Sequence, residues 1–163
     1  MRYNLIREMD ISNGPGLRVS IFMQGCSFHC KNCFNQETWD FDGGKEFTDE
    51  TIEKVLDLCG KNHIKGLSIL GGEPMHPRNI EATTKLAKAF KEKYPNKTLW
   101  VWSGFTFDKD LKDKVVLKYI DVLVDGTYID ELHDFTLKWK GSSNQRVIDV
   151  QKSLVSGKVV LFE

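Results

Sequence analysis

The apolar residues of the chain fall into short continuous runs that are separated by stretches with helical spacing. The runs are rich in Val, Ile, Leu, Phe and Trp and stop at Gly, Ser or Asp, which predicts buried strands. The predicted strands cover residues 17–24, 66–70, 99–102 and 120–124, with a short last strand over 158–162. The alternation fades after Asp130, so the carboxyl-terminal part is predicted to be less regular.

The stretches between these runs predict helices. Thr48 and Asn79 have side chains that can cap a helix start, and each precedes an apolar stripe. The stripes consist of Ile52, Val55, Leu56 and Cys59 after the first cap, and of Ile80, Thr83, Leu86, Ala87 and Phe90 after the second. Residues 95–96, Pro and Asn, end the second helix, and a third is predicted over residues 108–118.

Strands that alternate with helices in this way predict βαβ units and a parallel sheet. The unusual segments of the chain follow the predicted strands, so we expect the functional site at the carboxyl ends of the sheet. Four or five units are too few for a closed eight-stranded barrel. The sequence therefore predicts an α/β fold, a partial and open (β/α) barrel, in a single domain over residues 1–163.

Composition and charge exclude several classes of protein. The chain has 163 residues, of which 40% are hydrophobic, and 23 basic residues balance 23 acidic ones. A net charge of zero argues against wrapping a nucleic acid or lying on an anionic membrane. No run approaches the ~20 apolar residues of a membrane span, and the charged amino terminus does not resemble a signal peptide. We expect a cytoplasmic protein whose four cysteines stay reduced.

Three of those cysteines follow the first predicted strand with the spacing C-x3-C-x2-C. They are Cys26, Cys30 and Cys33, and no fourth cysteine lies near enough to complete a four-thiolate site. The triplet predicts a [4Fe-4S] cluster with one iron open to another ligand. The alternative is a zinc site that takes His29 as its fourth ligand, although His29 is adjacent to Cys30 in sequence. Cys59 lies on an apolar helix stripe and is expected to be a buried side chain.

The run Gly71-Gly72-Glu73-Pro74 follows the second predicted strand. Two glycines at a strand end allow the backbone to approach a ligand closely, and the carboxylate of Glu73 is placed to receive an ammonium group. Taken alone, a Gly-Gly pair is more often an ordinary turn. Its position one βα unit after the cysteine loop makes a binding role more specific.

The two motifs together resemble those of the radical S-adenosylmethionine (SAM) superfamily. The resemblance implies a partial (β/α) barrel and a [4Fe-4S] cluster whose open iron is chelated by the amino and carboxylate groups of SAM. It also implies reductive cleavage of SAM to methionine and a 5′-deoxyadenosyl radical. The cofactors then carry the radical chemistry, and no protein side chain acts as a catalytic group.

Further segments are similar to one branch of this superfamily, the glycyl-radical activating enzymes. These segments are Asn13-Gly14-Pro15-Gly16-Leu17-Arg18, the polar Asn32 before the third cysteine, and Trp139-Lys140-Gly141-Ser142-Ser143-Asn144-Gln145-Arg146. The last one resembles the activating proteins of anaerobic ribonucleotide reductases. The likeness extends from Asn13 to about Val150. The segment 139–146 either closes the site or meets the partner, or it is a loop packed on the sheet by Trp139.

The resemblance implies a role for each site residue. Cys26, Cys30 and Cys33 hold the cluster, while Asn32, Cys33, Phe34, Gly71, Gly72 and Glu73 contact SAM. The partner is the large subunit of the reductase, which receives a glycyl radical, and the electron donor is a flavodoxin or a similar small reductant. Asp125 either binds the cofactor ribose or the partner, or forms a turn. Two other functions stay open: a pyruvate formate-lyase-type activating enzyme, and a non-catalytic, zinc-stabilised binding module.

Overall fold

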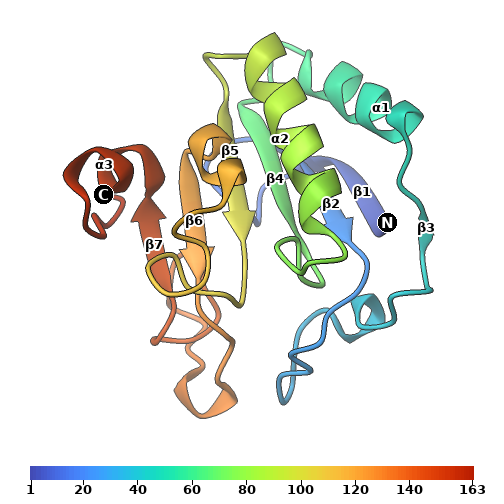
Figure 1. Ribbon diagram of the computed structural model, residues 1–163. Coiled ribbons are helices and arrows are strands. Elements are labelled where there is room, and N and C mark those ends of the chain that lie inside the picture. The colour runs from blue at the N-terminus through green and yellow to red at the C-terminus, as the bar shows by residue number, and fades with distance from the viewer.

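A seven-stranded mixed sheet forms the centre of the protein in the computed structural model, which describes residues 1–163 (Figure 1). The strands are β1 (Arg2–Asp10), β2 (Arg18–Met23), β3 (Lys45–Glu46), β4 (Gly66–Gly71), β5 (Thr98–Trp102), β6 (Val122–Asp125) and β7 (Arg146–Asp149). Their order in the sheet is β3-β1-β2-β4-β5-β6-β7.

The four central strands confirm the predicted parallel sheet. β2, β4, β5 and β6 pair in parallel, and each begins and ends within a few residues of its predicted bounds. β1, β3 and β7 are antiparallel to their neighbours and were not predicted. The predicted strand over residues 158–162 is reduced to a single bridge between Ile148 and Leu161.

Two of the three predicted helices are present, and a short unpredicted one follows β7. The helices are α1 (Asp49–Cys59), α2 (Ile80–Lys93) and α3 (Val150–Ser156). Thr48 caps α1, as expected, by accepting a hydrogen bond from the backbone N–H of Thr51. The prediction that Asn79 caps α2 is wrong, because its side chain makes no capping hydrogen bond.

The prediction of a helix over residues 108–118 is also wrong. This segment forms turns and then a short 3₁₀ helix over Val115–Tyr119. Its buried apolar residues are Leu111, Val116 and Leu117. Because Leu111 and Val116 are five positions apart, they do not share one stripe of an α-helix, which requires steps of three or four.

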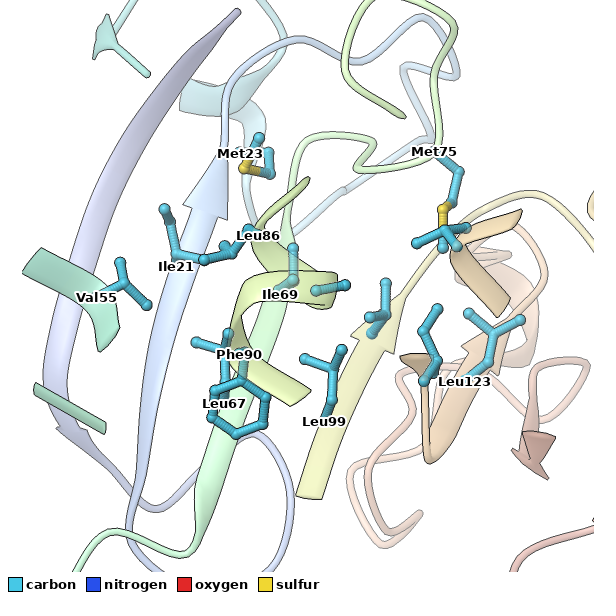
Figure 2. Packing of buried hydrophobic residues seen from close by; sticks show 14 of the residues in the cluster. Ile21, Met23, Val55, Leu67, Ile69, Met75, Leu86, Phe90, Leu99 and Leu123 are labelled. Atoms are coloured by element: carbon cyan, nitrogen blue, oxygen red, sulfur yellow. The ribbon is translucent and has the colours of Figure 1, made fainter. Parts of the chain in front are cut away.

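The hydrophobic core lies between the sheet and the helices α1 and α2, which cover the same face (Figure 1). Figure 2 shows Ile21, Leu67, Ile69, Leu99 and Leu123 of the sheet beside Leu86 and Phe90 of α2. Successive strand residues point to opposite faces, so the next residues along, Phe22, Leu70 and Trp102, lie on the face without these helices. That face borders a cavity of about 450 Å³. None of the helices is long and apolar enough to cross a lipid bilayer.

Arg18 braces the amino-terminal ends of the parallel strands. Its fully buried guanidinium donates to the Ser68 hydroxyl at 2.8 Å, to the Thr98 carbonyl at 2.8 Å and to the Thr98 hydroxyl at 2.9 Å. Further hydrogen bonds reach the carbonyls of Leu67 and Pro15. The glycine-rich segment before β2 thus ends in a cation that joins β2, β4 and β5 at the end away from the cysteine loop.

Candidate functional site

A cavity of about 450 Å³ opens at the carboxyl ends of the parallel strands. The loops that follow β2, β4, β5 and β6 all contribute to its wall, as the sequence predicted. In Figure 1 the cysteine loop and the loop after β6 project from this same end of the sheet. The cavity also extends along the helix-free face to Arg7, Ser12 and Asn13 near β1.

All three cysteines of the triplet line this cavity as free thiols. Cys26 is buried, whereas Cys30 and Cys33 are partly exposed. Burial, more than any other cause, raises the pKa of the Cys26 and Cys30 thiols above its usual range. A bound metal would reverse this shift, since coordination deprotonates a thiol.

The arrangement of the thiols fits an iron–sulfur cluster. No group of three or more His, Cys, Asp or Glu side chains is arranged to hold a single metal ion. A cubane cluster does not need such a group, because its thiolates bind different irons. Thiolates are soft donors that suit iron–sulfur clusters, and the cavity lining also includes the apolar rings of Phe28 and Trp39. His29, the alternative zinc ligand, instead stacks on Trp39 with ring centroids 4.4 Å apart and does not line the cavity.

The Gly-Gly-Glu-Pro loop packs directly against the cysteine loop. The backbone N–H of Gly72 donates to Met23 at 2.9 Å, and that of Glu73 donates to Gly25 at 2.8 Å. A Cβ at Gly72 would lie 2.5 Å from the Gly25 carbonyl oxygen. Gly71 has a φ of +106°, a left-handed conformation that favours glycine. The glycines are therefore required by the contact between the two loops, in addition to any approach of a ligand.

The side chain of Asn79 is hydrogen-bonded to both of these loops. Its buried side-chain amide donates to the carbonyls of Gln24 at 3.1 Å, Gly25 at 3.3 Å and Glu73 at 3.0 Å. Asn79, which the sequence analysis assigned to helix capping, instead links the cysteine loop to the Gly-Gly-Glu-Pro loop through hydrogen bonds. Capping would need the side-chain oxygen to accept from a backbone N–H of α2, and in the orientation set by these three donated bonds it accepts none.

Glu73 is almost fully buried, with 1% of its surface exposed. Its carboxylate accepts hydrogen bonds from the Ser103 hydroxyl at 2.7 Å, the Gly104 N–H at 2.6 Å and the Met75 N–H at 2.9 Å. Burial raises the pKa of Glu73 to about 7, although these three donors oppose the shift. A carboxylate has about four acceptor positions, so about one stays free for a ligand.

Asn32 and Phe34 differ in their relation to the cavity. Phe34 lines it and packs on Tyr128 with ring centroids 5.1 Å apart. Asn32 has a φ of +56°, and its side-chain amide donates to Asp130 at 2.8 Å. Asn32 is not among the residues that line the cavity. Its contact with SAM stays a prediction, while its contact with the loop after β6 is direct.

The segment 139–146 is both packed on the sheet and part of the cavity wall. The Trp102 indole N–H donates to the Trp139 carbonyl at 2.7 Å, and Trp139 packs against Trp100. The Gln145 side chain accepts from the Gly141 N–H at 2.9 Å and donates to the Gly126 carbonyl at 2.9 Å. The residues of this segment that line the cavity are Trp139, Lys140, Gly141 and Gln145. The alternative of packing on the sheet is confirmed, and the segment also forms part of the cavity wall, while its contact with the partner stays a prediction.

Asp125 is the buried partner of Arg146. The Arg146 guanidinium donates to both carboxylate oxygens of Asp125, at 2.7 and 3.0 Å, and to Asp108 at 2.8 Å. The Phe107 N–H also donates to Asp125 at 2.8 Å. These contacts show a structural ion pair between β6 and β7, and Asp125 does not line the cavity.

Ser103 and Asn79 are the two positioning residues that the sequence did not reveal. Ser103 follows β5 in the run Trp102-Ser103-Gly104, and neither its residue type nor its spacing indicates the contact with Glu73. Asn79 carried a stronger signal, namely helix capping, which concealed its tertiary contacts. The position of both residues beside strand ends was the available clue.

Comparison with known proteins defines the class and then the family. A family model described as a 4Fe-4S single cluster domain matches residues 12–148, so the chain is an iron–sulfur protein of that class. It is 42% identical over 148 residues to the anaerobic ribonucleoside-triphosphate reductase-activating protein of Vibrio cholerae, covering 89% of this chain and 96% of the relative. The proteins of the same name from Enterobacteria phage T4 and Escherichia coli K12 are 40% and 37% identical over 147 and 150 residues. Those matches cover 90% of this chain in both cases, and 93% and 97% of the relatives. The chain belongs to the family of anaerobic ribonucleoside-triphosphate reductase-activating proteins.

Proposed function

We propose that the protein activates an anaerobic ribonucleoside-triphosphate reductase by forming a glycyl radical on its large subunit. The observation that carries the proposal is the cavity shared by three free thiols and the Gly-Gly-Glu-Pro loop. The names of the similar proteins support the reductase as the partner. The sheet, with its cavity on the helix-free face, is compatible with the open partial barrel expected for radical SAM enzymes.

When bound, the cluster and SAM would supply the radical chemistry: one electron cleaves the sulfonium C–S bond, and the resulting 5′-deoxyadenosyl radical takes a hydrogen atom from the glycine. The electron comes from an external reductant, for which a flavodoxin is the proposed donor. Methionine and 5′-deoxyadenosine are the products. We also propose that the protein works in the reducing cytoplasm, where its thiols stay available as ligands.

The protein residues bind and position these groups. Cys26, Cys30 and Cys33 would each hold one iron and leave the fourth iron open to SAM. The free acceptor position of Glu73 would receive the ammonium group of SAM, which places charge opposite charge in a buried site. The apolar side chains of Phe28, Phe34 and Trp39 in the lining would limit the access of water to the bound groups.

The test uses anaerobically reconstituted protein with SAM, a strong reductant and the reductase. The proposal expects 5′-deoxyadenosine to form and a glycyl-radical EPR signal to appear on the reductase. Cleavage of SAM without a radical on the reductase would favour another glycyl-radical partner, such as a pyruvate formate-lyase. A colourless protein that binds zinc and has no affinity for SAM would replace the proposal with a binding module.

A further inference from the structure

Four large apolar side chains are exposed on the two loops that carry the cavity-lining residues Cys33, Tyr128 and Leu137. Phe34 is 60% exposed, Ile129 38%, Leu132 42% and Phe135 86%. We call these four residues the rim patch. Phe34 directly follows the third cysteine, and the other three belong to the loop after β6, which projects beside the cysteine loop in Figure 1. Exposure of large apolar side chains next to one another commonly marks an interaction site.

The two parts of the rim patch are fastened to each other. The Phe34 ring packs on Tyr128 with centroids 5.1 Å apart, and Asn32 donates to Asp130 at 2.8 Å. A surface ion pair between Lys31 and Glu131, at 3.9 Å, spans the same junction. The cysteine loop and the loop after β6 thus form one continuous edge of the cavity.

The loop that carries the patch is internally hydrogen-bonded. The backbone N–H of Ser143 donates to Leu132 at 2.9 Å, and the N–H of Ile129 donates to the Ser142 hydroxyl at 3.2 Å. A β-bridge joins His133 to Ser142. The exposed side chains are therefore presented by an ordered scaffold, which lowers the entropy lost when a partner binds.

The loop also divides its side chains between the cavity and the surface. Tyr128 and Leu137 line the cavity, whereas Phe135, only two residues from Leu137, is the most exposed aromatic side chain of the rim. A macromolecule that places a main-chain glycine inside the cavity must cover its mouth. Phe135 is the exposed aromatic side chain next to this lining that such a macromolecule could contact.

We propose that the rim patch is the docking surface for the reductase, through apolar side chains that flank its glycine-bearing segment. This inference rests on the proposed function, because the relatives are named as activating proteins of this reductase. Aromatic side chains at the centre of an interface commonly contribute most to affinity. Phe135 is the residue on which the docking should depend most.

The test compares Phe135→Ser with Val155→Ser in the full-length, cluster-loaded protein. Val155 is 91% exposed and lies on α3, so it controls for the loss of an exposed apolar side chain elsewhere. Phe135→Ser should weaken the affinity for the reductase about tenfold and raise the KM for the reductase to the same degree. Cleavage of SAM in the absence of the reductase should be unchanged, as should every property of Val155→Ser.

Two results would overturn the docking surface. One is an unchanged affinity of Phe135→Ser for the reductase. The other is a larger loss of affinity in Ile11→Ser, since exposed Ile11 lies beside Ser12 at the far end of the cavity. Affinity measured by ultracentrifugation separates this inference from the proposed function. If the wild-type protein binds the reductase through Phe135 but never cleaves SAM, the docking surface stands and the proposed activity is refuted. If the protein has no affinity for the reductase, both proposals are refuted.

Discussion

Ser103 donates its hydroxyl to the Glu73 carboxylate at 2.7 Å, joining the loop after β5 to the loop after β4. The same hydroxyl accepts a hydrogen bond from the Phe105 N–H at 3.0 Å. A buried carboxylate is thereby held in one orientation by groups from two neighbouring strand ends. The contact fixes the direction in which Glu73 presents its remaining acceptor position.

Removal of the Ser103 hydroxyl should destabilise the fold. Ser103→Ala leaves a buried carboxylate without one of its donors, for which a loss of about 1.5–3 kcal/mol is expected. The matched control is Ser143→Ala, because Ser143 is exposed and its side chain makes no hydrogen bond to the sheet. Urea unfolding measured under anaerobic conditions compares the two. Equal stability of the two variants would mean that the Ser103 contact contributes nothing.

The affinity for SAM should depend on pH through Glu73. Its pKa is raised to about 7, so the charged form is lost as the pH falls through that value. Only the carboxylate attracts an ammonium group, and binding should therefore weaken between about pH 7.5 and about pH 6. Equilibrium dialysis with cluster-loaded protein measures this change. 5′-Methylthioadenosine, which lacks the amino-acid part of SAM, should show no such dependence, and a parallel loss for both ligands would place the titration elsewhere.

Each cysteine of the triplet should be required for the cluster. Wild-type protein reconstituted anaerobically should contain about four irons per chain. Ser at Cys26, Cys30 or Cys33 removes one thiolate and should lower the iron content and abolish cleavage of SAM. Cys59→Ala should retain both, because Cys59 is fully buried in the core cluster and burial raises its pKa to about 12. Retained cleavage in Cys30→Ser would refute the cluster assignment.

Arg146 should contribute to stability mainly through Asp125. Arg146→Ala leaves the buried Asp125 carboxylate, 1% exposed, without its cation, and a loss of about 3–5 kcal/mol is expected. Asp108→Asn tests the other half of the contact. Asp108 is 50% exposed, so its loss should cost at most about 1 kcal/mol. The midpoints of urea unfolding of the two variants measure this difference. A larger loss of stability in Asp108→Asn than in Arg146→Ala would show that the exposed Arg146–Asp108 pair is the stronger one.

The sequence predicted the central parallel strands because their information is local: short apolar runs that end at Gly, Ser or Asp. β1 escaped notice for the opposite reason. On its exposed side β1 carries Leu5, Arg7 and Met9, so apolar residues are not confined to a buried face. Its place beside β2 is fixed by strand pairing that exists only in the folded chain. The segment 108–118 illustrates a third case. Its length and place between two strands suggested a helix, but the five-residue step between the buried Leu111 and Val116 does not form one apolar stripe of an α-helix.

For the site, the spacing of the thiols predicted which residues meet at the cavity. The metal-binding chemistry of a cysteine triplet depends on residue type and on short separation along the chain, and both can be read directly from the sequence. The roles of Asn79 and Ser103 depend on loops that lie 54–55 and 30 residues away in sequence, respectively, and that the sheet brings alongside. Their side chains fit several local roles equally well. Only the tertiary structure selects among these roles.

The link formed by Asn79 affects how the protein survives the loss of its cluster. Oxygen destroys exposed iron–sulfur clusters, and many sites would then unravel. Here the backbone of the cysteine loop is tied to the neighbouring loop by Asn79, Gly72 and Glu73 through bonds that involve no metal. Little conformational entropy must be lost when iron and sulfide return. The amino-terminal end of the cysteine loop is accordingly held in place by the protein alone, so reassembly of the cluster would begin from a partly ordered loop.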